Sequence, residues 1–185
     1  MCFGRTLGWV GAQSAGLYWR GEMTTVAEGG CLCGAVRYRV TARPARVTMC
    51  HCRFCQRATG GAYMVQPAIA ETDLAVIKGA PKVYAHRSEG SGKEIYIHFC
   101  ETCGTKVYQK FERFVGAAGI YAGTLDDPNW VVIRAETDKH IFTETARAET
   151  LLPAHMPIFR HHAIENDGTP NTADRLEAPC RGDAL

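Results

Sequence analysis

The chain contains no long hydrophobic run and carries almost no net charge. No apolar segment approaches the roughly 20 residues that cross a bilayer as a helix, so we expect no membrane span. The formal charge is only +2, from 21 Lys and Arg against 19 Asp and Glu. That is too little to favour nucleic acid or an anionic lipid surface as a partner. The 185 residues are 46% hydrophobic, which is enough for one domain with a real core.

Helical periodicity is also scarce, whereas polar and apolar residues often alternate. Because alternation is typical of half-buried strands, we expect strands at 35–41, 62–70, 74–79, 82–87, 94–100, 105–111 and, less regularly, 116–125. A short turn of helix is expected after Cys52 and a weak helical segment at 142–149. Pro67 predicts an edge or a bulge in its strand, because proline cannot donate to a sheet ladder. The pattern predicts a mainly β, antiparallel domain.

The two ends of the chain differ from its middle. We expect a disordered N-terminal extension at 1–26, a β domain at 27–155 and a C-terminal tail at 156–185. Glycine and polar residues interrupt the apolar stretch of the first 22 residues, which argues against a signal peptide and leaves Met23 as a plausible initiator. The sequence from about residue 160 lacks periodicity and is expected to be loose.

Nine cysteines is an odd number, and the density is too low for a disulfide scaffold. Cys2 and Cys180 stand alone near the ends. The other seven fall into three short groups: Cys31 and Cys33; Cys50, Cys52 and Cys55; Cys100 and Cys103. Short spacings without a convincing export signal favour metal binding over disulfides. They also favour a reducing compartment, which we take to be the cytoplasm.

Two of these groups are predicted to form one closed metal site. Cys31 and Cys33 are two positions apart, so in an extended segment both side chains leave the same face. Cys100 and Cys103 form a Cys-x-x-Cys motif, and Gly104 permits the tight turn that follows. Four thiolates indicate structural zinc, which would add on the order of 10 kcal/mol to a small core. An iron–sulfur cluster is less favoured, because the spacings match neither ferredoxin pattern.

The third group, "CHCRFC" at 50–55, has three sulfurs where a closed site needs four. Three ligands leave one position of a tetrahedral metal open. We expect that position to accept a thiol from outside the chain, which coordination would deprotonate. Two alternatives stay open: closure by a protein ligand such as His51 or His98, or no metal at all.

Three motifs together resemble the family of glutathione-dependent formaldehyde-activating enzymes, which includes centromere protein V. They are "GGCLCGAVRY", "CHCRFCQRATGGAY" and "HFCETCGTKVY", and the resemblance runs from about Gly29 to at least Tyr108. It implies an Mss4-like, zinc-stabilised β architecture for the domain at 27–155. It also implies structural zinc on Cys31, Cys33, Cys100 and Cys103, and a second, labile zinc on Cys50, Cys52 and Cys55.

The resemblance further implies a carbon–sulfur lyase type of reaction, in which formaldehyde and glutathione give S-hydroxymethylglutathione. Cys50, Cys52 and Cys55 would then be the catalytic group. Arg53 and Arg57 flank it, and we predict that they bind the carboxylates of glutathione, the alternative being ordinary solvated arginines. The expected partners are a small thiol and an aldehyde, not nucleic acid or membrane.

Two other interpretations stay open: a non-catalytic, zinc-stabilised binding module, and a thiol-responsive zinc protein. A binding module needs only the four-cysteine site, so the group at 50–55 separates it from the others. The segment "TGGAY" at 59–63 could bring backbone amides close to a ligand or form a plain tight turn. No residue stands out as a general base.

Overall fold

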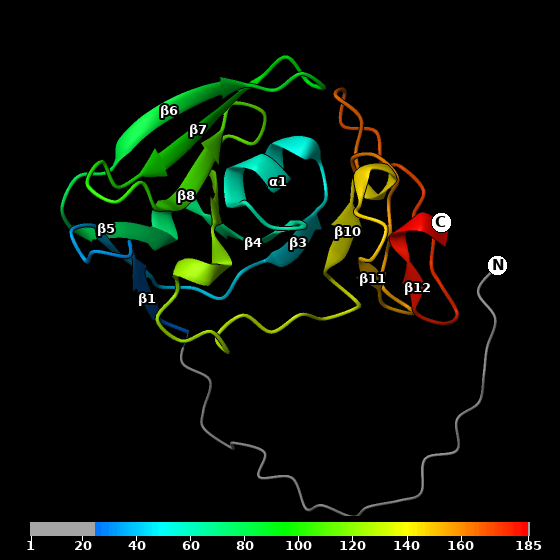
Figure 1. The fold of residues 1–185 in the computed structure, drawn as a ribbon. Coiled ribbons are helices and arrows are strands. Elements are labelled where there is room, and N and C mark those ends of the chain that lie inside the picture. Colours follow the sequence, from blue (N-terminus) through cyan, green and yellow to red (C-terminus); the bar gives the residue numbers. More distant parts are fainter. Residues whose placement is uncertain (1–24, 185) are drawn as a thin grey trace, which may run out of the picture.

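The computed structural model describes residues 25–184, whose strands form three sheets (Figure 1). The smallest pairs β11 (Leu151–Leu152) with β12 (Cys180–Arg181). A three-stranded antiparallel sheet has the order β1 (Ala27–Gly30), β2 (Arg37–Val40), β5 (Leu74–Lys78). The large sheet has seven strands in the order β10 (Lys139–Ile141), β3 (Arg46–Cys50), β4 (Met64–Ala70), β9 (Ala117–Ile120), β8 (Lys106–Phe111), β7 (Glu94–Phe99), β6 (Lys82–Arg87).

The strands of the described residues confirm the mainly β, antiparallel architecture that the sequence predicts. Every pairing in the large sheet is antiparallel except that of β10 with β3. Strand β10 is the last strand of the large sheet in chain order. Its parallel pairing with β3 places Ile141 beside Cys50. The sheet edge therefore brings residues near 140 to the end of β3.

Pro67 lies in a central strand, so the prediction of an edge or a bulge is wrong. Strand β4 has β3 on one side and β9 on the other. Pro67 pairs with Val47 of β3, whose N–H goes instead to the carboxylate of Asp138 at 2.6 Å. The ladder to β9 begins only at Ala68. Proline is tolerated here because no hydrogen bond is needed from its missing N–H.

Helical structure is sparse. Helix α1 (Arg53–Thr59) is the turn of helix expected after Cys52, and Gly60 ends it with a φ of 72°. Four short 3₁₀ turns lie at Glu71–Asp73, Ala122–Thr124, Thr143–Thr145 and Gly182–Ala184. The helix suggested at 142–149 is only the three-residue turn in that region. Within residues 25–184, no helix combines the length and the apolar character needed to cross a bilayer.

The large sheet packs a different core on each of its two faces. One core joins it to the three-stranded sheet and includes Tyr38, Val107 and Ile120, all almost fully buried. The other gathers Cys50, Cys55, Met64, Ile97 and Tyr121, with parts of α1 packed against it. Alternation along each strand sorts side chains between the two faces. The cysteines of 50–55 thus share a face with α1.

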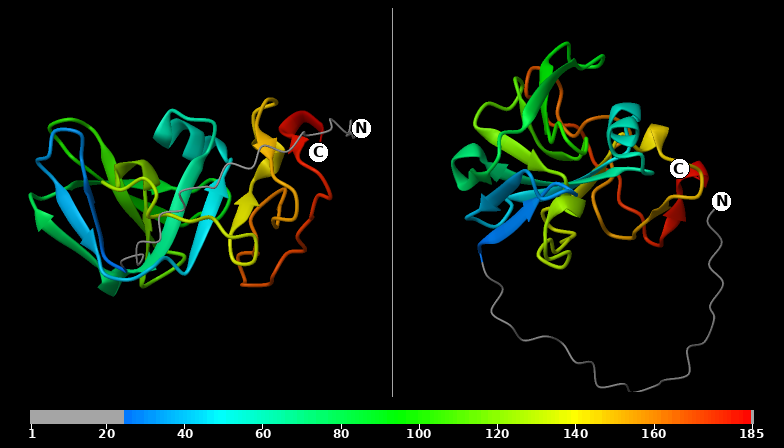
Figure 2. Two further views of the ribbon diagram at one scale, coloured as in Figure 1. Left: turned by 90° about the horizontal axis from the view of Figure 1, so that it is seen from below. Right: turned by 60° about the vertical axis from the view of Figure 1, so that its left-hand side comes forward.

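The segment after residue 156 is ordered, which contradicts the expectation of a loose tail. Ile158 bridges both His140 and Asp174, and Cys180 pairs with Leu152 in the small sheet. Ile158, Phe159, Ala163 and Cys180 are buried. Figures 1 and 2 show this segment packed beside β10 and away from β1. Isolated apolar residues without periodicity anchor it, which is why sequence pattern alone missed it. Our division at residues 27–155 and 156–185 stays a proposal, and most of 1–26 lies outside the described residues.

Candidate metal centres

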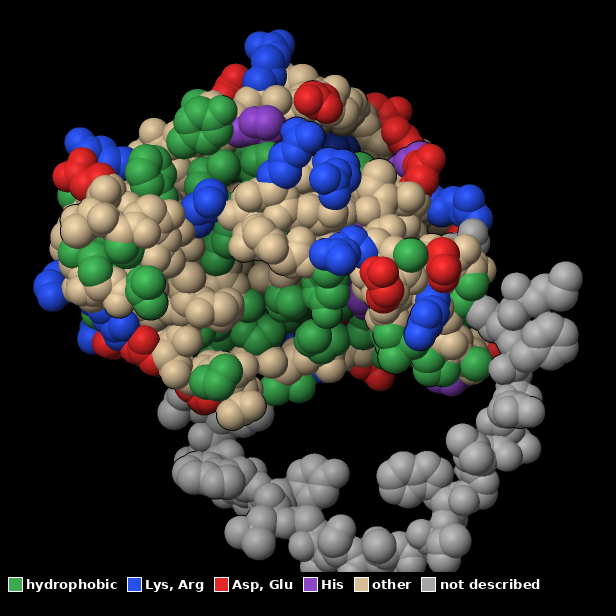
Figure 3. Space-filling view, viewed as in Figure 1, with side chains coloured by type: hydrophobic (Ala, Val, Ile, Leu, Met, Phe, Trp, Pro, Cys, Tyr) green, Lys and Arg blue, Asp and Glu red, His purple; other side chains and the backbone are tan. Residues whose placement is uncertain are grey.

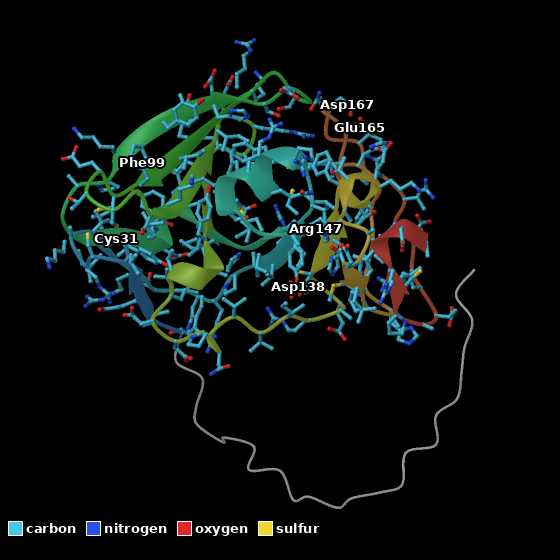
Figure 4. All side chains as sticks on the ribbon, viewed as in Figure 1. Cys31, Phe99, Asp138, Arg147, Glu165 and Asp167 are labelled. Atoms are coloured by element: carbon cyan, nitrogen blue, oxygen red, sulfur yellow. The ribbon has the colours of Figure 1, made fainter. Side chains whose placement is uncertain are left out.

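Cys31, Cys33, Cys100 and Cys103 converge from two distant parts of the chain. Their sulfur atoms all lie within 4.8 Å of one another. The Sγ of Cys33 lies 3.6 Å from that of Cys31 and 3.7 Å from that of Cys100. Sulfurs around a tetrahedral zinc, with Zn–S near 2.3 Å, are separated by about 3.8 Å. The spacing and the donor type both fit a four-thiolate metal site. Figure 4 places Cys31 with β5, far from Asp138 at the start of β10.

Two loops with the same hydrogen-bond pattern build this site. Gly34 donates its N–H to the carbonyl of Cys31 at 3.0 Å, and Gly104 donates to that of Cys100 at 2.8 Å. Each first cysteine in turn donates its N–H to the carbonyl five positions on. Both glycines have φ near 70°, at 73° and 71°, a region that favours glycine. Cys31 and Cys33 therefore lie in a turn, and the prediction that they lie in an extended segment is wrong.

Local donors favour the thiolate form of Cys31 and Cys103. The hydroxyl of Thr105 lies 3.2 Å from the Cys103 sulfur, and this contact together with backbone N–H groups lowers the pKa of Cys103 to about 5. The backbone N–H of Val36 donates to the Cys31 sulfur at 3.2 Å. The neighbouring sulfurs raise the pKa of Cys33 to about 11, so a metal would have to draw that thiol into the deprotonated form that binding needs. None of the eight described cysteines forms a disulfide.

Cys50, Cys52 and Cys55, which we call the triplet, form the second group. Cys50 ends β3, Cys52 caps the N-terminus of α1, and Cys55 lies in its first turn. Their sulfurs also lie within 4.8 Å of one another, and those of Cys50 and Cys52 are 3.5 Å apart. Cys50 and Cys55 are buried, whereas Cys52 is partly exposed. The triplet matches three corners of a tetrahedral site and leaves the fourth without a protein ligand among residues 25–184.

The three thiols do not titrate alike. The thiols of Cys50 and Cys55 donate to the sulfur of Cys52, which lowers the pKa of Cys52 to about 3. The same contacts raise the pKa values of Cys50 and Cys55 above the usual range, with burial adding to the effect. Without a metal, the triplet therefore concentrates its negative charge on Cys52. A cation would draw all three sulfurs into the thiolate form.

Polar contacts from residues near 140 hold the loop of the triplet in place. The amide of Gln56 donates to the carbonyls of His51 at 2.6 Å and Thr145 at 2.8 Å. The hydroxyl of Thr145 donates to the same His51 carbonyl at 3.0 Å, and the His51 N–H donates to Ile141 at 3.0 Å. Phe142 turns the chain between them with a φ of 57°, which is uncommon for a bulky residue.

Comparison with known proteins gives a family match over a segment that includes both cysteine groups. A family model described as "Glutathione-dependent formaldehyde-activating enzyme" matches residues 26–145, well over half of the chain. The chain belongs to this family. Both cysteine groups lie inside the matched segment, whereas Cys180 lies outside it.

Two individual proteins are also similar to this chain. A protein of Halomonas elongata, whose name proposes a glutathione-dependent formaldehyde-activating enzyme, is 25% identical over 134 residues, which cover 62% of this chain and 85% of that protein. A crystal structure of a Rhodobacter sphaeroides protein has 24% identity and a TM-score of 0.44, and the match covers 55% of this chain and 90% of that one.

Neither His51 nor His98 supplies a fourth ligand to the triplet. His51 is fully buried, and its Nε2 lies 2.9 Å from Nδ1 of His140. Burial lowers the pKa of His51 to about 4, so its ring is neutral at physiological pH. His98 instead stacks on Tyr108, with ring centroids 4.2 Å apart. Closure of the site by either histidine therefore has no support in the geometry.

The arginines beside the triplet lie on the exposed side of α1. Arg53 donates to the side-chain oxygen of Gln56, and Arg57 is exposed in the last turn. Figure 3 shows basic side chains around this part of the surface. Neither arginine lines a cavity next to the cysteines, so their role in binding glutathione stays a prediction.

Sequence reasoning missed several residues that surround the triplet. No sequence motif indicates that Gln56 and Thr145 hold the loop of the triplet. The one available signal is that Gln56 directly follows Cys55. Tyr121 packs in the same cluster as Cys50 and donates its hydroxyl to Gln109 at 3.2 Å. The glycine amides of 60 and 61 are already used, by the carbonyl of Gln56 and the hydroxyl of Thr59. They cap the helix rather than face a ligand.

Proposed function

We propose that this protein is a zinc-dependent enzyme of the carbon–sulfur lyase type that acts on glutathione or a related thiol adduct. The reaction we favour joins formaldehyde and glutathione into S-hydroxymethylglutathione. One observation carries the proposal: beside a four-cysteine group that can close a metal site alone, the chain holds a second group with only three sulfurs. Membership of the family supplies the substrate class.

The four-cysteine group would hold a structural zinc and the triplet a second one. A zinc ion there would lower the pKa of an incoming thiol and favour its thiolate at neutral pH. In the reaction, the thiolate sulfur forms a bond to the formaldehyde carbon. The π electron pair moves to the oxygen, which takes up the proton that the thiol released.

The residues of this chain would act mainly by positioning. Cys50, Cys52 and Cys55 converge on one point, and the Gln56 and Thr145 contacts keep the loop that carries them fixed. A metal held by these fixed sulfurs would bind a thiol at one defined place, which would favour its reaction with the aldehyde. We also propose the cytoplasm as the location, because free thiols and thiolate sites persist in a reducing compartment.

Metal content tests the second site. Protein purified without chelator should contain two zinc ions per chain by mass spectrometry, and dialysis against millimolar glutathione should lower this to one while the circular dichroism spectrum is unchanged. One zinc throughout, with three thiols of the triplet open to alkylation, would favour the non-catalytic binding module instead.

Activity must be measured against a background, because formaldehyde and thiols combine without a catalyst. Exchange spectroscopy by NMR gives the rate of S-hydroxymethylglutathione formation at equilibrium with and without protein. We expect acceleration by the wild type and none by Cys50→Ser. A rate equal to the background for zinc-loaded wild type would exclude this reaction and leave a thiol-responsive zinc protein as the alternative.

A further inference from the structure

A cavity of ≈160 Å³ opens on the same face of the large sheet as the triplet. Its polar and charged lining residues are Arg46, Thr48, Gln66, Lys139 and His162. Apolar side chains complete the wall, among them Ile141 and Ala163, which also pack in the cluster of Cys50 and Cys55. The cavity and the triplet are therefore neighbours across one layer of side chains.

Strand register gives the spacing between them. Ile141, Cys50 and Met64 are lateral neighbours on β10, β3 and β4, and they form one row across the sheet. Lys139, Thr48 and Gln66 form the next row on the same face. Two residues along a strand advance by about 6.7 Å. The polar row of the cavity thus begins about 7 Å from the sulfur row, and Arg46 lies one further row away.

The charged side chains that line this cavity are both positive. No Asp or Glu is among the lining residues, and neither Arg46 nor Lys139 forms an ion pair within residues 25–184. Asp138 adjoins Lys139 and attracts it, although its carboxylate accepts the N–H groups of Val47 and Arg134 and does not line the cavity. The Lys139 ammonium lies 5.6 Å from the centroid of the Phe159 ring. The carboxylate of Glu165, which follows the lining residue Ile164, accepts a hydrogen bond from the amide of Asn171.

A buried donor in the cavity also lacks a partner. The Nε2 atom of Gln66 is buried without any hydrogen bond in the structure. The side chain lies over Gly119, where an added Cβ would come within 2.3 Å of that nitrogen. A buried amide without a partner costs free energy, so this site favours a ligand with an acceptor oxygen. Gly119 provides the room in which the Gln66 amide lies against the cavity.

We propose that this cavity binds the glycine carboxylate of a glutathione-type thiol whose sulfur reaches the triplet. The inference rests on the proposed function, since it takes the thiol as the substrate. Lys139 and Arg46 supply the charge. Gln66 donates to a carboxylate oxygen once its amide, buried in the cavity wall, turns toward the ligand. It assigns to the cavity a role that we had predicted for Arg53 and Arg57.

Length and charge both select this end of the tripeptide. Three extended residues span at most about 11 Å, so a carboxylate one residue from the cysteine matches a row about 7 Å away. The glutamyl end carries an ammonium group beside its carboxylate, and Arg46 and Lys139 would repel that cation. The glycine end carries only negative charge, and it has no side chain to fit into a small cavity.

Calorimetric titration of the zinc-loaded full chain tests the inference from both sides. The ligands are glutathione and its glycine monoethyl ester, which has the same thiol but lacks that carboxylate. The variants are Arg46→Gln with Lys139→Met, and the matched control is Arg87→Gln with Lys78→Met, two exposed cations on β6 and β5. We expect the ester to bind the wild type about ten-fold more weakly than glutathione. The cavity variants should lose a similar factor for glutathione and little for the ester.

The outcomes separate this inference from the proposed function. Equal affinity of the wild type for glutathione and ester would overturn the carboxylate site, even if the variants fail to fold and turnover is normal. The expected binding pattern without any turnover above background would leave the carboxylate site standing and remove the proposed reaction. No binding of glutathione to the wild type would overturn both.

Discussion

The two cysteine groups differ in what holds them. Each loop of the four-cysteine group fixes its own geometry, through one glycine and two backbone hydrogen bonds within six residues. The triplet, by contrast, depends on Thr145 and Ile141, about 90 positions further along the chain. The first group is suited to stabilise the domain, because it joins two segments rigidly. The second is suited to exchange a ligand, because its protein ligands stop at three.

The largest effect is expected for Cys100→Ser. The sulfur of Cys100 is buried beside that of Cys33, and loss of one of four ligands should release the structural metal. Metal binding of on the order of 10 kcal/mol is comparable to the whole stability of a domain. We expect loss of the folded state or a drop in melting temperature of more than about 10 °C, measured by circular dichroism. Cys180→Ser, a buried cysteine outside both groups, is the control. Burial of its hydroxyl should lower the melting temperature by no more than about 5 °C.

Cys50→Ser should instead separate function from folding. The side chains are similar in size, so the free energy of unfolding should change by only about 1–2 kcal/mol. One of two zinc ions should be lost, and S-hydroxymethylglutathione formation should fall at least about 100-fold, since even supporting residues of metal sites cost 10–100-fold. Metal analysis and NMR exchange provide the readouts. Unfolding of Cys50→Ser to the extent of Cys100→Ser would make the triplet a second structural site.

Gln56→Ala tests whether distant contacts hold the triplet. It removes two hydrogen bonds to buried or half-buried carbonyls and should cost about 1–3 kcal/mol. The affinity for the second metal should fall about 10–100-fold, with the first metal unaffected. Competition with a chelator, followed by metal analysis, measures this.

Thr145 offers a matched pair for the same question. Thr145→Val removes the hydroxyl that donates to His51, whereas Thr145→Ser keeps it. Only the valine variant should weaken retention of the second metal. Equal behaviour of the two variants would show that the Thr145 hydroxyl does not hold the triplet.

The smallest effect concerns charge beside the four-cysteine group. Arg37 follows the first loop and forms a bidentate contact with Asp126, largely exposed. Arg37 lowers the pKa of Asp126 below 3.8, so the pair contributes in full at neutral pH and is lost as pH falls through that lowered pKa. Asp126→Asn should cost no more than about 1 kcal/mol.

Urea melts of wild type and Asp126→Asn at pH 7, and at the lowest pH where both stay folded, measure that difference. The two curves should converge as the pH falls. A cost at pH 7 as large as that of Cys100→Ser would mean that charge, rather than sulfur, holds this end of the domain.

Much of the fold could be predicted because the strands of the large sheet alternate. The segments 82–87 and 94–100 coincide with β6 and β7 almost residue for residue. The edge or bulge at Pro67 and the loose chain from about residue 160 are predictions that the structure contradicts, since both depend on which neighbour a strand or loop finds. The C-terminal segment is held against β10 by the bridge between Ile158 and His140, which no local sequence pattern predicts.

By itself, the sequence determined the fold class and which seven cysteines form groups that could bind a metal. Spacing and glycine punctuation are local, and local backbone chemistry follows from neighbouring residues. Only the tertiary structure decided that the four-cysteine loops meet, that Gln56 and Thr145 hold the triplet, and that Lys139 and Gln66 form a basic row beside it. Cys33 and Cys100 are 67 positions apart, and Gln56 and Thr145 are 89 positions apart. The contacts made by residues near 140 arise from the pairing of β10 with β3, which one sequence does not reveal.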